Sequence, residues 1–306
     1  TQKGLDYIHN HKADEMVVGV REGVEEDDSK KNQNDFVLWF TKSKFDEQDL
    51  KWESPWGLSY PGWHIECSAM SLKYLGEQFD IHTGGVDHIP THHENEIAQS
   101  KGMCGKIPAN YWMHGEFLLI NGGKMSKSLG NVYLLQDIVD RGYDPLVYKL
   151  FCYSIQYRKK LNFTWEGMDS AKIALDRLRE AYQKHLTGTE DVAEELISKY
   201  EKDFNEAIND DLNMPVAMSV VWEVAKRTEK SKKVAELLKK FDRVLGIKID
   251  EHKEEEIPDD IKELLTKRVE ARKNKDWAES DKIRDIIKEK GYIVKDSKEG
   301  QTVEKC

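Results

Sequence analysis

The sequence predicts an α/β segment, followed by an all-α helical bundle and a small C-terminal α/β module. Before Pro145, short apolar runs of strand length alternate with helix-forming stretches and glycine-rich turns, which is typical of a mostly parallel sheet. After Pro145, glycine becomes rare and apolar residues recur at helical spacing. Beyond an acidic stretch that contains Pro258, two more helical patterns precede a short strand-like run.

The elements of the α/β segment follow from local composition. Three apolar runs of strand length predict strands at Phe36–Phe40, Phe79–His82 and Phe117–Ile120. The second strand is expected to run into a glycine turn at Thr83-Gly84-Gly85. Stretches rich in good helix formers predict two helices, over residues 67–74 and 92–100.

The rest of the chain shows helical periodicity. Apolar residues from Ala171 to Leu245 predict a bundle of about four helices. Asp210-Asp211, followed by Leu212-Asn213-Met214-Pro215, predicts a loop that enters a helix. In the last module we expect helices over residues 261–273 and 277–290, then a short strand over 291–295.

These patterns divide the chain into four segments. Residues 1–34 are polar and highly charged, so we expect a surface connection between folded pieces. Residues 35–145 form the α/β segment, and residues 146–250 form a helical stem and bundle. Residues 251–306 form a linker and the small module.

Composition excludes several classes of protein. The 306 residues are 39% hydrophobic and include 8 Trp and 12 Tyr, which argues against disorder. Their net charge of −10 argues against wholesale electrostatic binding of nucleic acid. A local basic face is still compatible with that charge. No run of about 18 apolar residues exists, so we expect no membrane contact. Four scattered cysteines and no signal sequence predict a cytoplasmic protein, and nothing suggests an obligate interface, so we expect a monomer.

The first candidate site is the string Lys124-Met125-Ser126-Lys127-Ser128, which follows two glycines and a predicted strand. Two lysines among small hydroxyl residues suit a polyphosphate, because the ammonium groups of Lys124 and Lys127 can offset the charge of a leaving pyrophosphate. A generic pair of lysines at this spacing is usually an exposed loop. The full five-residue string in an α/β segment is more specific.

The second candidate site combines Cys67, His92 and Glu96. His92 and Glu96 lie four residues apart, so one helix face presents both, and thiolate, imidazole and carboxylate are all zinc ligands. Each residue alone has an ordinary alternative, as a buried cysteine or a polar helix face. Structural roles are the usual explanation for histidines, but their density in this stretch also indicates a metal site or a polar pocket: His64, His82, His88, His92, His93 and His114.

A third, weaker signal is Gly84-Gly85-Val86-Asp87 after a predicted strand. Glycines allow close approach of the backbone to a ligand, and a carboxylate can hold ribose hydroxyls. Most strings of this kind are simple turns, so both explanations stay open.

Taken together, these strings resemble cysteinyl-tRNA synthetase, a class I aminoacyl-tRNA synthetase. Besides Lys124–Ser128, the matching stretches are Asp35–Trp39, Ser54–Gly57, Pro61–Met70, His92–Ser100 and Asp210–Asn213. The tail Arg272–Ala278 also resembles the family's C-terminal module, so the resemblance covers nearly the whole chain from about Gly19 onward. It implies that residues 35–145 are the C-terminal half of a Rossmann-type catalytic domain with its KMSKS loop, and that the bundle is an anticodon-binding domain.

The resemblance implies ATP-dependent ligation of L-cysteine to tRNA(Cys) through a cysteinyl-adenylate, with Mg²⁺ accompanying ATP. Zn²⁺ would hold the substrate thiolate and so separate cysteine from serine, which is nearly the same size. By resemblance the zinc ligands are Cys67, His92 and Glu96, and Trp63 lines the cysteine pocket.

The resemblance also assigns the nucleotide and tRNA contacts. Gly85 and Asp87 would approach the adenosine of ATP, while Lys127, helped by Lys124, would bind its phosphates and stabilise the transition state. A basic cluster is a candidate tRNA contact, although an ordinary solvated helix face explains it equally well: Lys267, Arg268, Arg272, Lys273 and Lys275.

The sequence departs from the family pattern in two places. It contains no His-x-Gly-His string and lacks the family's N-terminal zinc-ligating cysteine, so we expect a C-terminal piece that requires the missing N-terminal part of the enzyme. We therefore expect the isolated chain to be inactive and to hold zinc through three protein ligands, more loosely than a four-ligand site. At Asp87–Thr91, including His88, many relatives carry a more apolar run.

Two other functions stay open. A cysteine ligase acting on a small amine would share the chemistry, but it would need neither the bundle nor the tail module. A non-catalytic tRNA- or zinc-binding remnant would explain the missing segment, but it has no need for the Lys124–Ser128 loop. Cysteine-dependent pyrophosphate exchange separates the remnant from both ligases, and charging of tRNA separates the two ligases.

Overall fold

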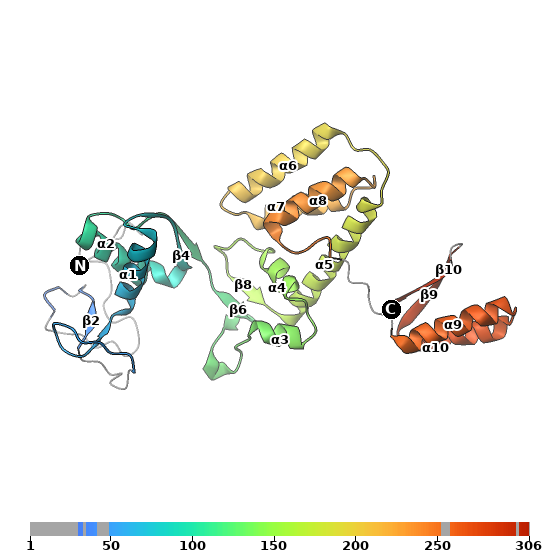
Figure 1. The fold of residues 1–306 in the computed structure, drawn as a ribbon, viewed down its shortest axis with the longest axis horizontal. Coiled ribbons are helices and arrows are strands. Elements are labelled where there is room, and N and C mark those ends of the chain that lie inside the picture. The colour runs from blue at the N-terminus through green and yellow to red at the C-terminus, as the bar shows by residue number, and fades with distance from the viewer. Residues whose placement is uncertain (1–29, 33–34, 42–48, 252–257, 298–299, 306) are drawn as a thin grey trace. The chain divides into compact units, whose positions relative to one another are not determined.

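The computed structural model describes residues 30–32, 35–41, 49–251, 258–297 and 300–305 (Figure 1). Contacts within the chain divide it into two compact units, Thr1–Asp250 and Glu251–Cys306. Most of the predicted connecting segment 1–34, most of the linker before Pro258, and Cys306 lie outside the described residues. The division of the first unit at residues 34 and 145 stays a prediction.

The α/β part of the first unit is built on two parallel strands and two helices (Figure 1). Strands β4 (Phe79–Gly85) and β5 (Ala109–Gly115) pair in parallel, and α2 (Glu94–Cys104) belongs to the connection between them. Helix α1 (Trp63–Leu75) packs against α2. Both predicted helices are therefore confirmed, and a parallel pair joined through a helix is the expected βαβ arrangement.

Two predicted strands differ from the structure. The run Phe36–Phe40 forms only the two-residue strand β2 (Trp39–Phe40), which pairs antiparallel with β3 (Tyr60–Pro61). The predicted glycine turn after His82 is wrong, because β4 continues through both glycines. Gly84 and Gly85 pair with His114 and Gly115 of β5.

A second small sheet carries the lysine loop. Strand β6 (Leu118–Ile120) pairs in parallel with β8 (Leu161–Phe163) and antiparallel with β7 (Gly123–Lys124). The tight turn between β6 and β7 places Asn121 and Gly122 at φ of 49° and 78°, a left-handed region that glycine and asparagine tolerate best. A 3₁₀ turn, η4 (Lys127–Leu129), and helices α3 (Leu135–Asp140) and α4 (Pro145–Cys152) follow.

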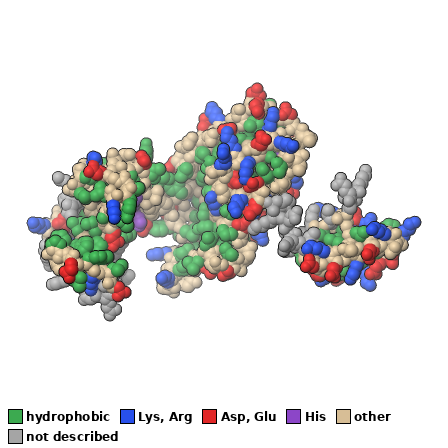
Figure 2. Space-filling view, viewed as in Figure 1, with side chains coloured by type: hydrophobic (Ala, Val, Ile, Leu, Met, Phe, Trp, Pro, Cys, Tyr) green, Lys and Arg blue, Asp and Glu red, His purple; other side chains and the backbone are tan. Residues whose placement is uncertain are grey.

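The predicted helical bundle is confirmed. It consists of α5 (Trp165–Leu186), α6 (Glu194–Asn209), α7 (Met214–Ala225) and α8 (Lys232–Leu245). Each helix buries one apolar stripe, and Phe204 stacks on Phe241 with ring centroids 4.1 Å apart. Each fully buried side chain of this size contributes about 1.5–3 kcal/mol, so packing of these stripes holds the bundle together. On the face seen in Figure 2, acidic and basic side chains intermingle over the bundle.

The C-terminal unit contains helices α9 (Asp259–Lys273) and α10 (Trp277–Glu289), which pack against each other. Strands β9 (Tyr292–Ser297) and β10 (Gly300–Lys305) form an antiparallel hairpin, of which only the first strand was predicted. Arg268 is buried and donates to both carboxylate oxygens of Asp296 at 2.9 and 3.0 Å. Arg268 therefore stabilises this unit from inside and does not belong to a solvent-facing basic cluster.

None of the helices in the described part of the chain is long and apolar enough to cross a lipid bilayer.

Candidate active site around Cys67, His92 and Glu96

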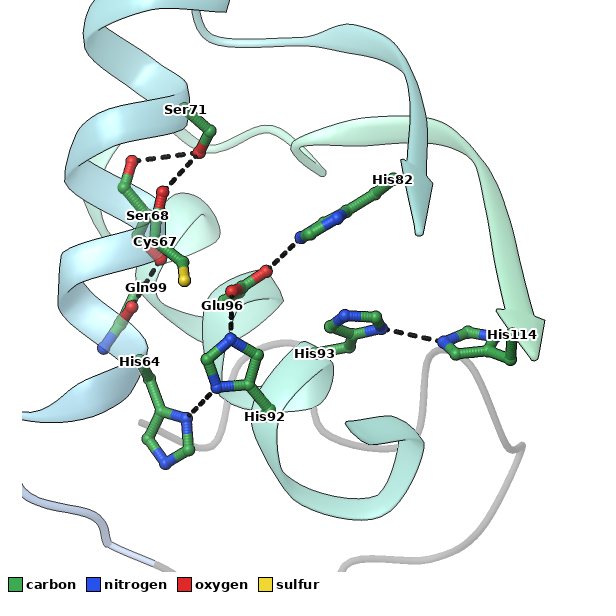
Figure 3. A network of polar contacts seen from close by, with 10 residues as sticks. All are labelled: His64, Cys67, Ser68, Ser71, His82, His92, His93, Glu96, Gln99 and His114. Carbon is green, nitrogen blue, oxygen red and sulfur yellow. Dashed lines mark hydrogen bonds and ion pairs between the residues drawn. The ribbon is translucent and has the colours of Figure 1, made fainter. Parts of the chain in front are cut away.

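Helices α1 and α2, with the π-helical turn that precedes α2, bring the predicted zinc ligands together (Figure 3). Cys67 lies on α1, and Glu96 lies in the first turn of α2. A π-helical turn at Ile89–His93 precedes α2, and it accommodates Pro90 because a first turn leaves backbone N–H groups unused. One ligand atom from each of Cys67, His92 and Glu96 lies within 4.8 Å of the others.

The Glu96 carboxylate is the centre of the cluster. Its Oε1 atom lies 2.7 Å from His92 Nε2, and its Oε2 atom accepts a hydrogen bond from His82 Nε2. Burial by itself would raise the pKa of Glu96, but the hydrogen bonds and charges of His82 and His92 outweigh it and lower the pKa to about 2. Glu96 is therefore ionised at neutral pH and available as an anionic ligand.

The pKa of the Cys67 thiol is shifted upward, whereas that of Glu96 is shifted downward. Burial, followed by the negative charge of Glu96, raises the pKa of its thiol to about 11. The thiol is therefore protonated at neutral pH when no cation is present. A divalent cation between Cys67 and Glu96 would offset the negative charge of Glu96 and favour the thiolate.

The outer nitrogen of His92 is also engaged. His92 Nδ1 lies 2.8 Å from His64 Nδ1, which orients the ring and directs Nε2 toward Glu96. A ligating histidine is usually held through its second nitrogen in this way.

Trp63, the first residue of α1, packs its ring on His92 with centroids 4.3 Å apart and meets the edge of His88 at 5.5 Å. Trp63 is 45% exposed, so part of the indole remains open beside the candidate metal ligands. This is the position expected of a residue that lines a small-molecule pocket.

Further aromatic side chains pack around His82, the histidine that contacts Glu96. His93 Nδ1 is 2.8 Å from His114 Nε2 on β5. Trp112, also on β5, packs against His82 and His93 with ring centroids 4.9 and 5.0 Å apart. Burial, reinforced by the neighbouring histidines His82, His114 and His88, lowers the pKa of His93 to about 3 even though Glu96 opposes the shift, so this ring is neutral at physiological pH.

The predicted adenosine contacts lie at the end of β4. Gly85 is the last residue of that strand, and Asp87 is exposed in the 3₁₀ turn Val86–His88. An exposed carboxylate that follows the C-terminal end of a parallel strand is well placed to accept hydrogen bonds from ribose hydroxyls.

The lysine loop has a defined form. Asn131 accepts a hydrogen bond from the Ser126 amide at 2.8 Å and donates to the Lys124 carbonyl at 2.9 Å, so it closes the loop from inside. Ser126 caps the 3₁₀ turn through the Leu129 amide. Both Lys124 and Lys127 are exposed, which leaves their ammonium groups available to an anion.

Some residues of the cluster were not singled out from the sequence. Trp112 was missed because its contacts with His82 and His93 arise only when β4 and β5 pair. The sequence offered little signal for Trp112, because burial along β5 does not alternate with a period of two residues. The link that Glu96 makes between His82 and His92 also depends on the fold, because the chain must turn back after β4 to bring Glu96 to His82, 14 residues earlier.

Comparisons with known proteins show the family of this chain. Residues 2–173 match the catalytic domain of class I (C) tRNA synthetases, residues 203–250 match the DALR domain, and residues 254–303 match the cysteinyl-tRNA ligase anticodon-binding domain. The match over residues 2–173 places the chain among the class I tRNA synthetases.

Individual relatives narrow the family. The cysteine–tRNA ligase of Treponema denticola is 42% identical over 94% of this chain and 65% of its own length. Cysteine–tRNA ligase 1 of Burkholderia lata is 43% identical over 89% of this chain and 57% of its own length. The cysteine–tRNA ligase of Protochlamydia amoebophila is 38% identical over 98% of this chain and 66% of its own length. The chain belongs to the cysteinyl-tRNA synthetase family and spans between 57% and 66% of the length of these relatives.

Among solved structures, a LeuRS–tRNA–LeuAMS complex from Agrobacterium radiobacter K84 matches with a TM-score of 0.49 and 14% sequence identity. The match covers 68% of this chain and 34% of the matched chain. That likeness is too low to support an inference.

Proposed function

We propose that this chain supplies the zinc-, phosphate- and tRNA-binding parts of a cysteine–tRNA ligase. The observation that carries the proposal is that Cys67 of α1, His92 of the π-helical turn and Glu96 of α2 lie close together in a member of the cysteinyl-tRNA synthetase family. The reaction would join L-cysteine to tRNA(Cys) at the expense of ATP, which enters with Mg²⁺.

The donor set fits Zn²⁺. A sulfur, a nitrogen and an oxygen atom lie within 4.8 Å of one another, which small rotations of the side chains can close around a tetrahedral ion. Glu96 is ionised, and His64 holds the outer nitrogen of His92. When bound, zinc would favour a substrate thiolate over a hydroxyl, which supplies the selectivity that a size difference alone cannot.

The protein side chains would perform the remaining steps. Trp63 would form a wall of the cysteine pocket, next to His92. Gly85 and Asp87 would hold the adenosine, so that the cysteine carboxylate can attack the α-phosphate. Lys127, helped by Lys124, would offset the negative charge of the departing pyrophosphate. Cysteine would then pass from the adenylate to the terminal ribose of the tRNA.

Cobalt provides a test on the 306-residue chain itself. Metal-free chain loaded with one equivalent of Co²⁺ should show a thiolate-to-cobalt absorption band that is lost in Cys67→Ser. L-cysteine should intensify the band by adding a second thiolate, and L-serine should leave it unchanged. An equal response to both amino acids, or no band at all, would refute the proposed thiolate selection.

The same preparation separates the alternatives when binding of tRNA(Cys) is measured beside it. A cysteine response together with tRNA(Cys) binding is the result expected for the ligase. A cysteine response without tRNA binding would instead favour a ligase for a small amine. Binding of tRNA without a cysteine response would favour a non-catalytic remnant.

A further inference from the structure

A hydrogen bond joins the two helices that carry the sulfur and the carboxylate of the candidate metal site. Ser68, the residue after Cys67 on α1, donates from its hydroxyl to Gln99 Oε1 on α2 at 2.5 Å (Figure 3). We propose that Ser68 and Gln99 are positioning residues, whose hydrogen bond keeps Cys67 close enough to Glu96 for both to bind one zinc-class ion. This inference rests on the proposed function.

The hydrogen bond lies beside both ligands. Ser68 follows Cys67 directly, and Gln99 follows Glu96 by three residues, which is close to one helical turn. Residues at this spacing lie on the same side of a helix, so Glu96 and Gln99 both face α1. A movement of α1 that carries Cys67 away from Glu96 therefore also stretches the bond between Ser68 and Gln99.

Burial does little to fix the position of α1. None of the residues of α1 is buried, whereas α2 buries Ile97 completely. The contact between His64 and His92 holds the first turn of α1. Beyond that turn, a hollow of about 540 Å³ is lined by apolar residues of both helices together with Ser68 and Gln99. Apolar packing is incomplete there, so the hydrogen bond supplies the fixed distance.

A zinc-class ion tolerates little variation in this distance. Zn²⁺ binds sulfur at about 2.3 Å and a carboxylate oxygen at about 2.0–2.2 Å. The ligand atoms of Cys67, His92 and Glu96 lie within 4.8 Å of one another, so side-chain rotation can bring them to one ion only while the helices stay in place. Supporting residues usually hold such ligands within about 0.5 Å of the geometry that binds.

The Gln99 amide distinguishes a positioning role from a purely structural one. Its Nε2 atom is buried and has no hydrogen-bond partner among the residues that the structure describes. An unpaired buried donor costs free energy, and a leucine of similar shape avoids that cost. Ser68 is only partly buried, so water can satisfy its hydroxyl after the substitution. Gln99→Leu should therefore weaken metal binding without lowering the stability of the metal-free chain.

Titration of the 306-residue chain with Co²⁺ tests both effects. The metal-free chain is titrated against a competing chelator, and the thiolate-to-cobalt band reports the fraction of chain that holds the ion. Ser68→Ala and Gln99→Leu should each raise the dissociation constant of Co²⁺ by about 10-fold, the lower end for residues that support metal ligands, because they act through the helix. Urea unfolding of the metal-free chains should show Gln99→Leu at least as stable as the wild type.

Ser71→Ala is the matched control. Ser71 lies on α1 three residues after Ser68, and its hydroxyl donates to the carbonyls of Cys67 and Ser68 at 2.8 and 3.2 Å, so both bonds stay within α1 (Figure 3). Its Co²⁺ affinity should equal that of the wild type. The double variant Ser68→Ala, Gln99→Leu should lose no more affinity than either single variant, because both substitutions remove the same bond.

The positioning role and the proposed function fail in different ways. An unchanged dissociation constant in Ser68→Ala and Gln99→Leu overturns the positioning role, and so do losses that add in the double variant or that Ser71→Ala shares. If Gln99→Leu does not fold, the comparison of Ser68→Ala with Ser71→Ala decides alone. A wild-type chain without the thiolate band would instead refute the Cys67 site itself, and both proposals with it.

Discussion

Gly84 shows how one residue controls the position of the histidine cluster. Its Cα faces the rings of His88 and His93, and a Cβ there would lie 2.8 and 2.7 Å from them. His93 is fully buried against Trp112 and His114, so it has little room to retreat. At Gly85 a Cβ would meet only the carboxylate of the exposed Asp87, which can turn away into solvent.

This difference predicts opposite outcomes for two neighbouring substitutions. Gly84→Ala should destabilise the chain by about 1–3 kcal/mol, because overpacking forces buried rings off their positions. Gly85→Ala should cost far less and is the matched control. Urea unfolding curves of the two metal-free variants measure the comparison. Equal stability of both variants would show that the rings have room to move and that Gly84 imposes no constraint.

At the scale of elements, the turn between α6 and α7 is tied to the segment before β8. Asp211 accepts hydrogen bonds from the Tyr157 hydroxyl at 2.7 Å and from Gln156 Nε2 at 3.1 Å, and it pairs with Arg158 at 2.8 Å. Asp211 and Leu212 both have left-handed backbone conformations, with φ of 51° and 53°. The polar contacts thus hold a turn that non-glycine residues adopt reluctantly.

Substitutions at Asp211 should separate the contacts from the backbone conformation. Asp211→Ala should cost about 1–2 kcal/mol, because it removes the three contacts and keeps the strained φ, with solvent exposure limiting the loss. Asp211→Asn should cost less, since asparagine tolerates this conformation and can still accept from Tyr157. Urea unfolding of the bundle reports both values. A larger loss for asparagine than for alanine would contradict this account.

The elements also show why sequence reasoning succeeded in some places and failed in others. The bundle helices α5–α8 were predictable because their apolar spacing is a local property that each helix buries on one face. The strand through Gly84 and Gly85 was predicted as a turn, because its pairing with β5 and its approach to His93 depend on residues that are distant in sequence. In the same way, the Cys67, His92 and Glu96 set followed from family resemblance, whereas the contacts of Trp112 needed the folded sheet.

At the scale of the whole molecule, the chain consists of two compact units that make most of their contacts internally. The second unit contains the buried Arg268, whose two terminal nitrogens donate hydrogen bonds to Asp296 and Gln301. Arg272 also pairs with Asp296, at 2.6 Å. The hydrogen bonds from Arg268, and then from Arg272, hold the pKa of the Asp296 carboxyl well below its usual range. This interaction lies entirely within one unit, so its loss should leave the other unit unaffected.

Acid should therefore weaken the C-terminal unit through Asp296. A carboxyl whose pKa is lower in the folded state than the ordinary value of 3.8 contributes stability above that value and loses it as the pH falls below. Asp296→Asn should destabilise this unit at neutral pH by about 2 kcal/mol, because Arg268 stays buried beside a neutral partner. The same substitution should make the stability of the unit depend less on pH in acid.

Asp260→Asn, which disrupts an exposed pair with Lys290 in the same unit, is the control and should change little. Pulse-labelling hydrogen exchange after equilibration in urea reads peptides from both units in one experiment. Unfolding of peptides from the first unit in step with those of the second would show that the two units fold as one.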